Sequence, residues 1–292
     1  MQKGAYTLLI TPFKKNLSLD EEGLKQLVQR QIKAGIHGIA PLGVTGENTL
    51  LTDDEVLKVI DIIVKEANGK SLIVPDICVM SLWKGLEKIK QFTNLGVDYI
   101  CVFAPYFILP KADGVIKFYE KLADASEVPI LLHNAQARTG IDMAPETTAY
   151  LAKHPNIIGI KDGNKKLDHL AKVLHLSKDE DFDVFTGKDT TAFPFVSFGG
   201  SGSFTVSGNV VPKVMKNMLD FAINNEKEKA ESLHNEYYDL FEALRFETNP
   251  MAAKRALNLM NLPAGSLRLP LTELSVNKTQ ILKKILIEKR LI

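Results

Sequence analysis

A lysine stands at the end of an apolar run in the middle of this chain. Lys161 follows Ile157–Ile160 and precedes Asp162 and Gly163, a pattern typical of a buried strand that ends at a glycine. Lysine is rarely buried without a partner, and an apolar site disfavours its charged form. A neutral amine can attack a carbonyl carbon and form a Schiff base. The same pattern also fits a strand-end lysine whose head reaches solvent.

Other candidate groups follow other apolar runs. Gly43–Glu47 is either a plain turn or a nest of backbone N–H groups that binds a carboxylate, and it lacks the lysine spacing of a phosphate loop. His133 ends an apolar run and, taken alone, fits a hydrogen-bonded core histidine. Because no second His or Cys stands nearby at ligand spacing, we expect no metal site. Arg138 is either a surface charge or a clamp for an acidic substrate.

The elements that position these groups alternate between strand-like and helical patterns. The predicted strands are Tyr6–Pro12, Gly38–Gly43, Ser71–Cys78, Tyr99–Ala104, Pro129–His133, Ile157–Lys161, Val184–Thr186 and Ser203–Ser207. The predicted helices between them are Asp20–Lys33, the segment from the Thr52 capping box to Asn68, Leu82–Thr93, Gly114–Ala125, Pro145–Lys153, Lys166–Leu176 and a short piece after Asp189. Eight such units predict an α/β fold, a parallel (β/α)8 TIM barrel, with an open doubly wound sheet as the alternative.

Helical spacing continues to the end of the chain. The later predicted helices are Val214–Asn224, Glu226–Leu244, Pro250–Met260 and Lys278–Arg290. We therefore expect a catalytic barrel over residues 1–224 and a C-terminal helical region over residues 225–292. Active sites of such barrels lie at the carboxyl ends of the strands, which would bring Lys161, His133 and Gly43–Glu47 to one rim.

Composition narrows the class of protein. The chain has 292 residues, 45% of them hydrophobic, and 36 basic against 35 acidic side chains give a net charge of +1. No basic stripe indicates nucleic-acid binding, and no apolar run approaches the ~18 residues of a membrane span. The two cysteines, Cys78 and Cys101, lie in apolar runs and fit reduced core residues. With no secretory signal pattern either, we expect a cytoplasmic, globular protein.

Several of these motifs, taken in order, resemble the dihydrodipicolinate synthase / N-acetylneuraminate lyase family of class I pyruvate aldolases. The resemblance runs nearly end to end, from Ile10–Phe13 to Leu267–Pro270. Its specific pieces are Gly43–Glu47, Ala135–Gly140, Gly159–Asp162, Thr186–Asp189 and Glu247–Pro250. The resemblance implies a barrel with a helical C-terminal region, often a tetramer built from dimers, with no metal or organic cofactor because the lysine itself supplies the electron sink.

The resemblance also implies a role for each candidate residue. Lys161 resembles the lysine that condenses with the keto carbon of pyruvate. The backbone N–H groups of Val44 and Thr45, with the Thr45 hydroxyl, would hold the pyruvate carboxylate. The backbone carbonyl of Phe204 would contact bound pyruvate, and Arg138 matches the arginine that recognises the carboxylate of the second substrate in the synthase branch.

Three positions depart from the family pattern. His133 stands where the family has a proton-shuttling tyrosine, Val44 where the synthase branch has a hydroxyl residue, and Phe107 where it has a second tyrosine. All three relay hydroxyls are therefore missing. A histidine with an unperturbed pKa of about 6.5 can still exchange protons, which predicts a rate that changes steeply between about pH 5.5 and 7.5. The strand segment Pro75–Cys78 also lacks the glycine-rich ending of the family.

We expect a lyase or aldolase that acts on pyruvate or a related 2-keto acid through Lys161. One alternative is 4-hydroxy-tetrahydrodipicolinate synthase activity, which joins pyruvate to aspartate semialdehyde in lysine biosynthesis. Arg138 favours that alternative, while Val44, Phe107 and His133 count against it. A second alternative is a catalytically silent homologue that binds a keto acid. In each case the expected partners are a small-molecule 2-keto acid and further copies of the chain, as a dimer or tetramer.

Overall fold

A closed parallel sheet forms the centre of the molecule. The structure is a computed structural model that describes residues 1–164 and 166–292. In these residues nine strands form one sheet in the order β3-β2-β1-β9-β8-β7-β6-β5-β4, and every pair is parallel. The strands are β1 (Gly4–Leu8), β2 (Gly38–Ala40), β3 (Leu72–Ile73), β4 (Asp76–Ile77), β5 (Ile100–Phe103), β6 (Ile130–Asn134), β7 (Ile157–Asp162), β8 (Asp183–Thr186) and β9 (Gly202–Thr205).

The two ends of this strand order meet, because β3 and β4 are halves of one extended segment. On one side of that segment the Asp76 N–H donates to the Pro41 carbonyl at 3.0 Å, beyond the end of β2. On the other side the Cys101 N–H of β5 donates to the Pro75 carbonyl at 2.9 Å. The sheet is therefore a barrel in which β3 and β4 share one position, and the predicted (β/α)8 architecture is confirmed.

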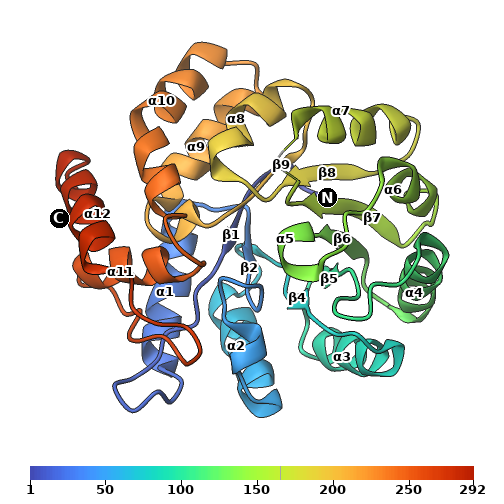
Figure 1. The fold of residues 1–292 in the computed structure, drawn as a ribbon, viewed down its shortest axis with the longest axis horizontal. Coiled ribbons are helices and arrows are strands. Elements are labelled where there is room, and N and C mark those ends of the chain that lie inside the picture. The colour runs from blue at the N-terminus through green and yellow to red at the C-terminus, as the bar shows by residue number, and fades with distance from the viewer. Residues whose placement is uncertain (165) are drawn as a thin grey trace.

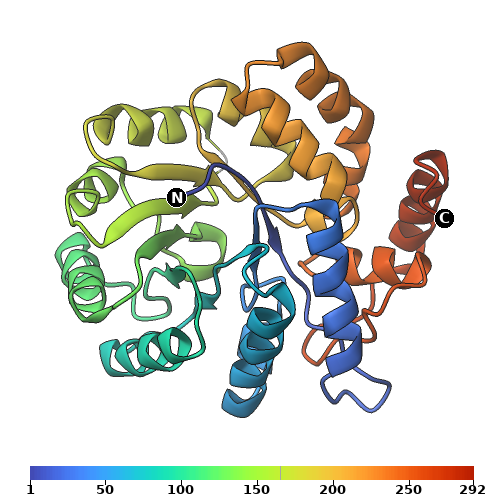
Figure 2. The ribbon, with the colours of Figure 1, turned by 180° about the vertical axis from the view of Figure 1, so that it is seen from behind.

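Helices cover the outside of the barrel (Figures 1 and 2). Those that alternate with the strands are α1 (Glu21–Ala34), α2 (Asp53–Ala67), α3 (Leu82–Asn94), α4 (Ala112–Ala125), α5 (Gln136–Thr139), α6 (Pro145–Leu151), α7 (Leu167–Leu176), α8 (Asp189–Ser197) and α9 (Pro212–Ile223). The C-terminal helices are α10 (Lys227–Ala243), α11 (Met251–Leu259) and α12 (Val276–Glu288). The short α5 is an addition to the predicted elements.

The C-terminal helices share a second hydrophobic cluster and also pack against helices of the barrel. Helix α10 packs against α8 and α9, and its buried Ala230 and Phe241 belong to the main hydrophobic core. Helices α11 and α12 pack against each other on the side of the barrel where α1 lies (Figure 1). The division after residue 224 stays a prediction. None of the helices in the described residues has the length and apolar composition needed to cross a membrane.

Local sequence explains where the helices begin. The predicted capping box at α2 is present, because the Glu55 N–H donates to the Thr52 hydroxyl at 3.2 Å and the Thr52 N–H donates to the Glu55 carboxylate at 3.0 Å. In α1, Leu24, Leu27 and Val28 lie on one face and are buried against the sheet. These two helices flank β2, the strand that leads into Gly43–Glu47.

Aromatic rings fill the barrel interior below the carboxyl ends of its strands. Tyr6 of β1, Phe185 of β8 and Phe204 of β9 are fully buried, and their ring centroids lie 5.0 to 5.4 Å apart. A side chain at Gly38 would collide with the Tyr6 ring, since a Cβ there would lie 2.1 Å from Cδ1. Side chains therefore fill the interior at this level, below the carboxyl rim.

Candidate active site

Lys161 and a carboxylate face each other inside the carboxyl end of the barrel. The Lys161 Nζ donates to Asp76 Oδ2 at 2.8 Å, and the two side chains are 4% and 0% exposed. The Lys161 head also lies 5.2 Å from the ring centroid of Phe204. Lys161 is buried as predicted, but its neighbourhood is not the apolar one that the sequence analysis expected. A buried negative charge is its direct partner.

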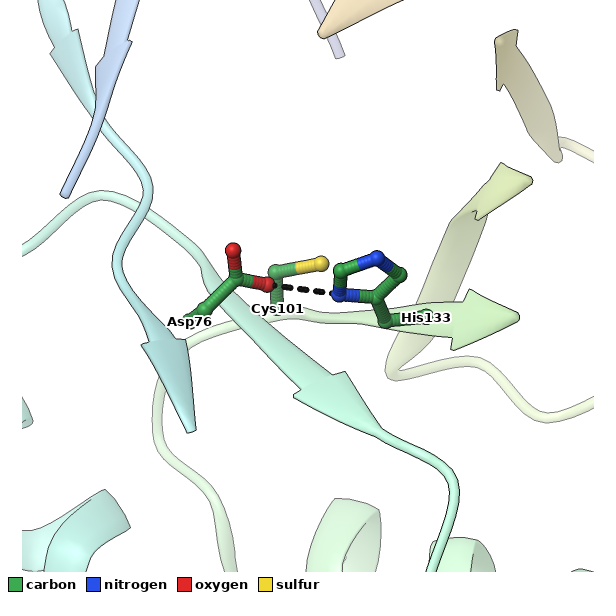
Figure 3. Close-up of side chains that lie close together, drawn as sticks. All are labelled: Asp76, Cys101 and His133. Atoms are coloured by element: carbon green, nitrogen blue, oxygen red, sulfur yellow. Dashed lines mark hydrogen bonds and ion pairs between the residues drawn. The ribbon is translucent and has the colours of Figure 1, made fainter. Parts of the chain in front are cut away.

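Asp76 lies beside polar side chains of β5, β6 and β7, and Figure 3 shows two of these side chains, Cys101 of β5 and His133 of β6. Asp76 Oδ1 lies 2.9 Å from His133 Nδ1, and the Cys101 sulfur lies within 4.8 Å of a ligand atom of each of these side chains. Strand register explains the meeting, because His133 of β6 pairs with Lys161 of β7, and Asp76 of β4 pairs with Cys101 of β5. Sequence reasoning missed Asp76 as a site residue. Its one signal was a lone carboxylate inside the apolar segment from Ser71 to Cys78.

The charges in this cluster set its protonation. Burial by itself raises the pKa of Asp76, but the Lys161 ammonium and the His133 ring outweigh burial and hold that pKa well below its usual range. Burial lowers the pKa of His133, Lys161 lowers it further, and Asp76 opposes this change without cancelling it. Near neutral pH, Asp76 is therefore a carboxylate and His133 a neutral imidazole. The imidazole donates its Nδ1–H to Asp76 and keeps a lone pair on Nε2.

A cavity of about 290 Å³ opens above this cluster. Gly43 lies between the cavity and the cluster of Asp76, Lys161 and His133. A Cβ on Gly43 would lie 2.5 Å from Asp76 Oδ2 and 3.9 Å from Lys161 Nζ. Phe103 lines the cavity and packs against His133, with ring centroids 3.8 Å apart. The other lining residues are Leu42, Val44, Glu47, Asn48, Thr49, Leu50, Cys78, Tyr106, Arg138, Thr139, Thr248, Asn249, Pro270 and Leu271. The cavity therefore borders the cluster at Gly43 and Phe103.

The turn at Gly43–Glu47 presents backbone donors beside the lysine. The Gly46 and Asn48 N–H groups both donate to the Gly43 carbonyl, at 3.1 and 3.4 Å, and close the turn. Within residues 1–164 and 166–292, no protein group accepts a hydrogen bond from the Val44 or Thr45 N–H. Two adjacent unbonded N–H groups fit the predicted carboxylate nest. The Thr45 hydroxyl accepts a hydrogen bond from Asn249 Nδ2 at 2.7 Å.

A buried ion pair anchors the same turn to the C-terminal region. Glu47 adopts a left-handed backbone conformation, with φ of 54°, and its carboxylate lies 2.5 Å from Lys254 Nζ of α11. Both side chains are almost wholly buried. Burial lowers the pKa of Lys254 to about 8, although Glu47 acts against this change. The Arg268 N–H donates to the other oxygen of Glu47 at 3.2 Å, so residues far along the chain fix the position of the turn.

Of the remaining predicted site residues, three lie at the cavity or beside the lysine, and one does not. Arg138 on α5 and Val44 line the cavity, and Phe204 lies beside the lysine. Phe107 is 85% exposed, with φ of 68°, and its neighbour Tyr106 takes the place on the cavity wall. The structure of one chain therefore brings every predicted site residue except Phe107 to the same rim.

Three possible metal ligands meet in this site, which the spacing along the chain did not indicate. Asp76, Cys101 and His133 offer ligand atoms within 4.8 Å of one another. Carboxylate, thiolate and imidazole are all zinc ligands. Two features oppose a cation here. Lys161 already forms an ion pair with Asp76, and burial raises the pKa of Cys101 well above its usual value, with Asp76 raising it further, so that the thiol stays neutral. We therefore assign no metal to this cluster.

Comparisons with known proteins agree over the whole chain. The model of the dihydrodipicolinate synthetase family matches residues 1–289. A 4-hydroxy-tetrahydrodipicolinate synthase of Methanospirillum hungatei JF-1 is 35% identical over 288 residues, 98% of this chain and 99% of the relative. The crystal structure of a dihydrodipicolinate synthase from Thermotoga maritima is 33% identical, with a TM-score of 0.97 and 100% of both chains covered. That of a chloride-inhibited dihydrodipicolinate synthase from Acinetobacter baumannii complexed with pyruvate is 31% identical, with the same TM-score and coverage.

Proposed function

Because the chain belongs to the dihydrodipicolinate synthetase family, we propose that Lys161 forms a Schiff base with pyruvate or a closely related 2-keto acid. The observation that carries this proposal is the buried Lys161 head, which lies between an acid–base pair and a carboxylate nest at the bottom of a small cavity. The protein is then a class I lyase, and its lysine takes the place of a metal or organic cofactor.

The site supplies each step of such a reaction. The unbonded N–H groups of Val44 and Thr45 hold the keto-acid carboxylate, and this places the neighbouring keto carbon over Lys161. Attack of the amine and loss of water give an iminium, which withdraws electrons from the adjacent methyl carbon. His133 Nε2 removes a proton from that carbon, and the resulting enamine attacks an aldehyde. The bond cleaved or formed is then carbon–carbon.

For the second substrate we propose aspartate semialdehyde, as in a 4-hydroxy-tetrahydrodipicolinate synthase. The name of the Methanospirillum hungatei relative supports this choice. So does Arg138, whose guanidinium on the cavity wall suits the free carboxylate of that aldehyde. Val44 and His133 replace hydroxyl side chains of the synthase pattern, so proton transfer follows a different route here.

The test is borohydride reduction in the presence of pyruvate, read by peptide mass spectrometry, followed by an assay with pyruvate and aspartate semialdehyde. We expect a reduced pyruvyl adduct on Lys161, none in Lys161→Met, and an unchanged adduct in Lys172→Met, which alters an exposed lysine of α7. An adduct without turnover of the semialdehyde leads to a screen of other aldehydes. Tight pyruvate binding without any adduct contradicts the proposal and supports a catalytically silent homologue.

Two further expectations belong to this proposal. The first is a homo-oligomer, a dimer or tetramer, and the exposed apolar side chains of Phe107, Ile108 and Leu109 after β5 fit burial against another copy. The second is a cytoplasmic location. Sedimentation of the purified protein tests the first expectation, and fractionation of cells tests the second.

A further inference from the structure

The carboxylate of Asp76 touches the amine on which the proposed reaction depends. Its Oδ2 lies 2.8 Å from Lys161 Nζ, its Oδ1 lies 2.9 Å from His133 Nδ1, and none of its side chain is exposed. We infer that Asp76 is a catalytic residue, which accepts the proton that Lys161 loses before it attacks and later donates that proton to the departing hydroxyl. This inference rests on the proposed function and adds to it a residue and a proton route.

An ammonium group has no lone pair and cannot attack a carbonyl. Lys161 therefore needs a proton acceptor, and its 4% exposure leaves bulk water little access to the nitrogen. Among the described residues, Asp76 is the hydrogen-bond and ion-pair partner of Nζ, while Phe103 and Phe204 present only ring faces to it. The geometry satisfies the reach that general acid–base catalysis requires.

The protons balance along this route. Lys161 transfers one proton to Asp76 Oδ2, and the free amine forms a carbon–nitrogen bond with the keto carbon. The attacking nitrogen then loses a proton to the former keto oxygen, which gives a neutral carbinolamine. As the carbon–oxygen bond breaks, Asp76 donates its proton to the leaving hydroxyl and water departs. Asp76 ends as a carboxylate beside the positive iminium, just as it began beside the ammonium.

The same carboxylate assists the following step through His133. The imidazole donates Nδ1–H to Asp76, so Nε2 has the lone pair and is the atom that can take a proton from the methyl carbon. Figure 3 shows Nε2 turned away from Asp76. When His133 becomes an imidazolium, Asp76 stabilises its charge, as the acid of a serine-protease triad does for its histidine. The Asp76 carboxylate thus takes part in two proton transfers, one at Lys161 and one through His133, in place of the missing hydroxyl relay.

A purely structural role explains this arrangement poorly. Buried ion pairs contribute little net stability relative to apolar side chains of similar volume, so folding alone gives no reason for a charge inside the barrel. The close approach of Asp76 also requires a glycine at position 43. Besides each other, the titratable groups that shift the pKa values of Asp76 and His133 are Lys161 and Asp162, and the titratable groups whose pKa values Asp76 raises are Cys78, Cys101 and Tyr119.

Two measurements on Asp76→Asn test the inference. The first is the rate of borohydride trapping with pyruvate at pH 7, which we expect to fall by about 10²- to 10⁴-fold, the usual effect of a lost acid–base catalyst. The second is carbamylation of Lys161 by cyanate without substrate, read by peptide mass spectrometry. We expect it to become faster, because asparagine cannot form the ion pair that the Lys161 amine makes with Asp76.

These opposite changes distinguish a catalytic role from a structural one, since a distorted site would change both rates in the same direction. Asp98→Asn removes a carboxylate that binds the Ile73 N–H, away from the cavity, and is expected to trap pyruvate at the wild-type rate. If Asp76→Asn does not fold, as judged by circular dichroism, Asp76→Ser carries the same expectations. Wild-type trapping rates in either folded Asp76 variant overturn the inference alone. Absence of any adduct in the wild-type protein overturns the proposed function as well.

Discussion

Asn249 Nδ2 donates to the hydroxyl of Thr45 at 2.7 Å, which joins the segment between α10 and α11 to the turn beside Lys161. These residues are 204 positions apart in the sequence. The Glu47–Lys254 ion pair makes a second connection between the same two regions. The C-terminal region therefore takes part in the active site, because it fixes the hydroxyl and the backbone donors that the proposal assigns to the keto-acid carboxylate.

The first prediction concerns this contact. Asn249→Ala leaves the Thr45 hydroxyl without its donor, so the hydroxyl can rotate away from the carboxylate. We expect KM for pyruvate to rise by roughly 5- to 10-fold, as for the loss of one hydrogen bond of about 1 kcal/mol, with a smaller change in kcat. Steady-state kinetics measure both constants. Asn224→Ala, at the exposed end of α9, is the matched control, and an equal rise in that variant would contradict the assignment.

The second prediction concerns the floor of the cavity. In Gly43→Ala the new methyl group would lie 2.5 Å from Asp76 Oδ2, so the carboxylate has to move away from Lys161. A displacement of about 1 Å at a reacting group costs on the order of 100-fold in rate, and we expect kcat to fall by at least that factor. Gly114→Ala on α4, where the new methyl group meets only Pro110 at 3.3 Å, should retain full activity. Similar kcat values for the two variants would show that Asp76 tolerates displacement.

The third prediction concerns pH. Burial and Lys161 lower the pKa of His133, so the imidazole stays neutral at pH values where a free histidine is already protonated. The base form is therefore present above this lowered pKa and is lost as the pH falls through it. We expect the acidic fall in kcat/KM to lie at lower pH than the range of about 5.5 to 7.5 that an unperturbed histidine gives.

A pH profile of kcat/KM for the wild-type protein and for His133→Gln checks this expectation. The glutamine variant keeps a donor toward Asp76 but has no titrating base, so its acidic decline should disappear and its rate should be lower at every pH. If kcat/KM falls at the same acidic pH in both proteins, the titrating group is not His133.

The fourth prediction separates the two substrates. Arg138 lines the cavity on α5, and the proposal gives it the carboxylate of the aldehyde. Arg138→Ala should leave borohydride trapping of pyruvate unchanged and raise KM for aspartate semialdehyde by about 10- to 100-fold, the loss of one charge-assisted interaction. Arg138→Lys should recover only part of this affinity, because an ammonium cannot form the paired hydrogen bonds of a guanidinium. A change in pyruvate trapping alone would place Arg138 in the first half-reaction.

The sequence by itself predicted the barrel and drew attention to Lys161 at the end of one of its strands. Eight repeats of a short apolar segment and an amphipathic one have few arrangements other than a parallel barrel, and the observed strands follow the predicted ones closely. The Thr52 capping box was predictable because its contacts span three residues. Lys161 was predictable because a charged side chain at the end of a buried strand needs an explanation, and the carboxyl rim of a barrel provides one.

Only the tertiary structure decided what surrounds Lys161. Asp76 lies 85 positions from the lysine and 57 from His133, and nothing local in the sequence links them. Their meeting depends on strand register and on which side chains point into the barrel, since a shift of one residue turns a side chain to the other face. The loop after β5 likewise decides that Tyr106 rather than Phe107 faces the cavity, because the backbone of Phe107 is left-handed there, with φ of 68°. Periodicity along the chain fixes the elements, while the register between strands fixes the chemistry at their ends.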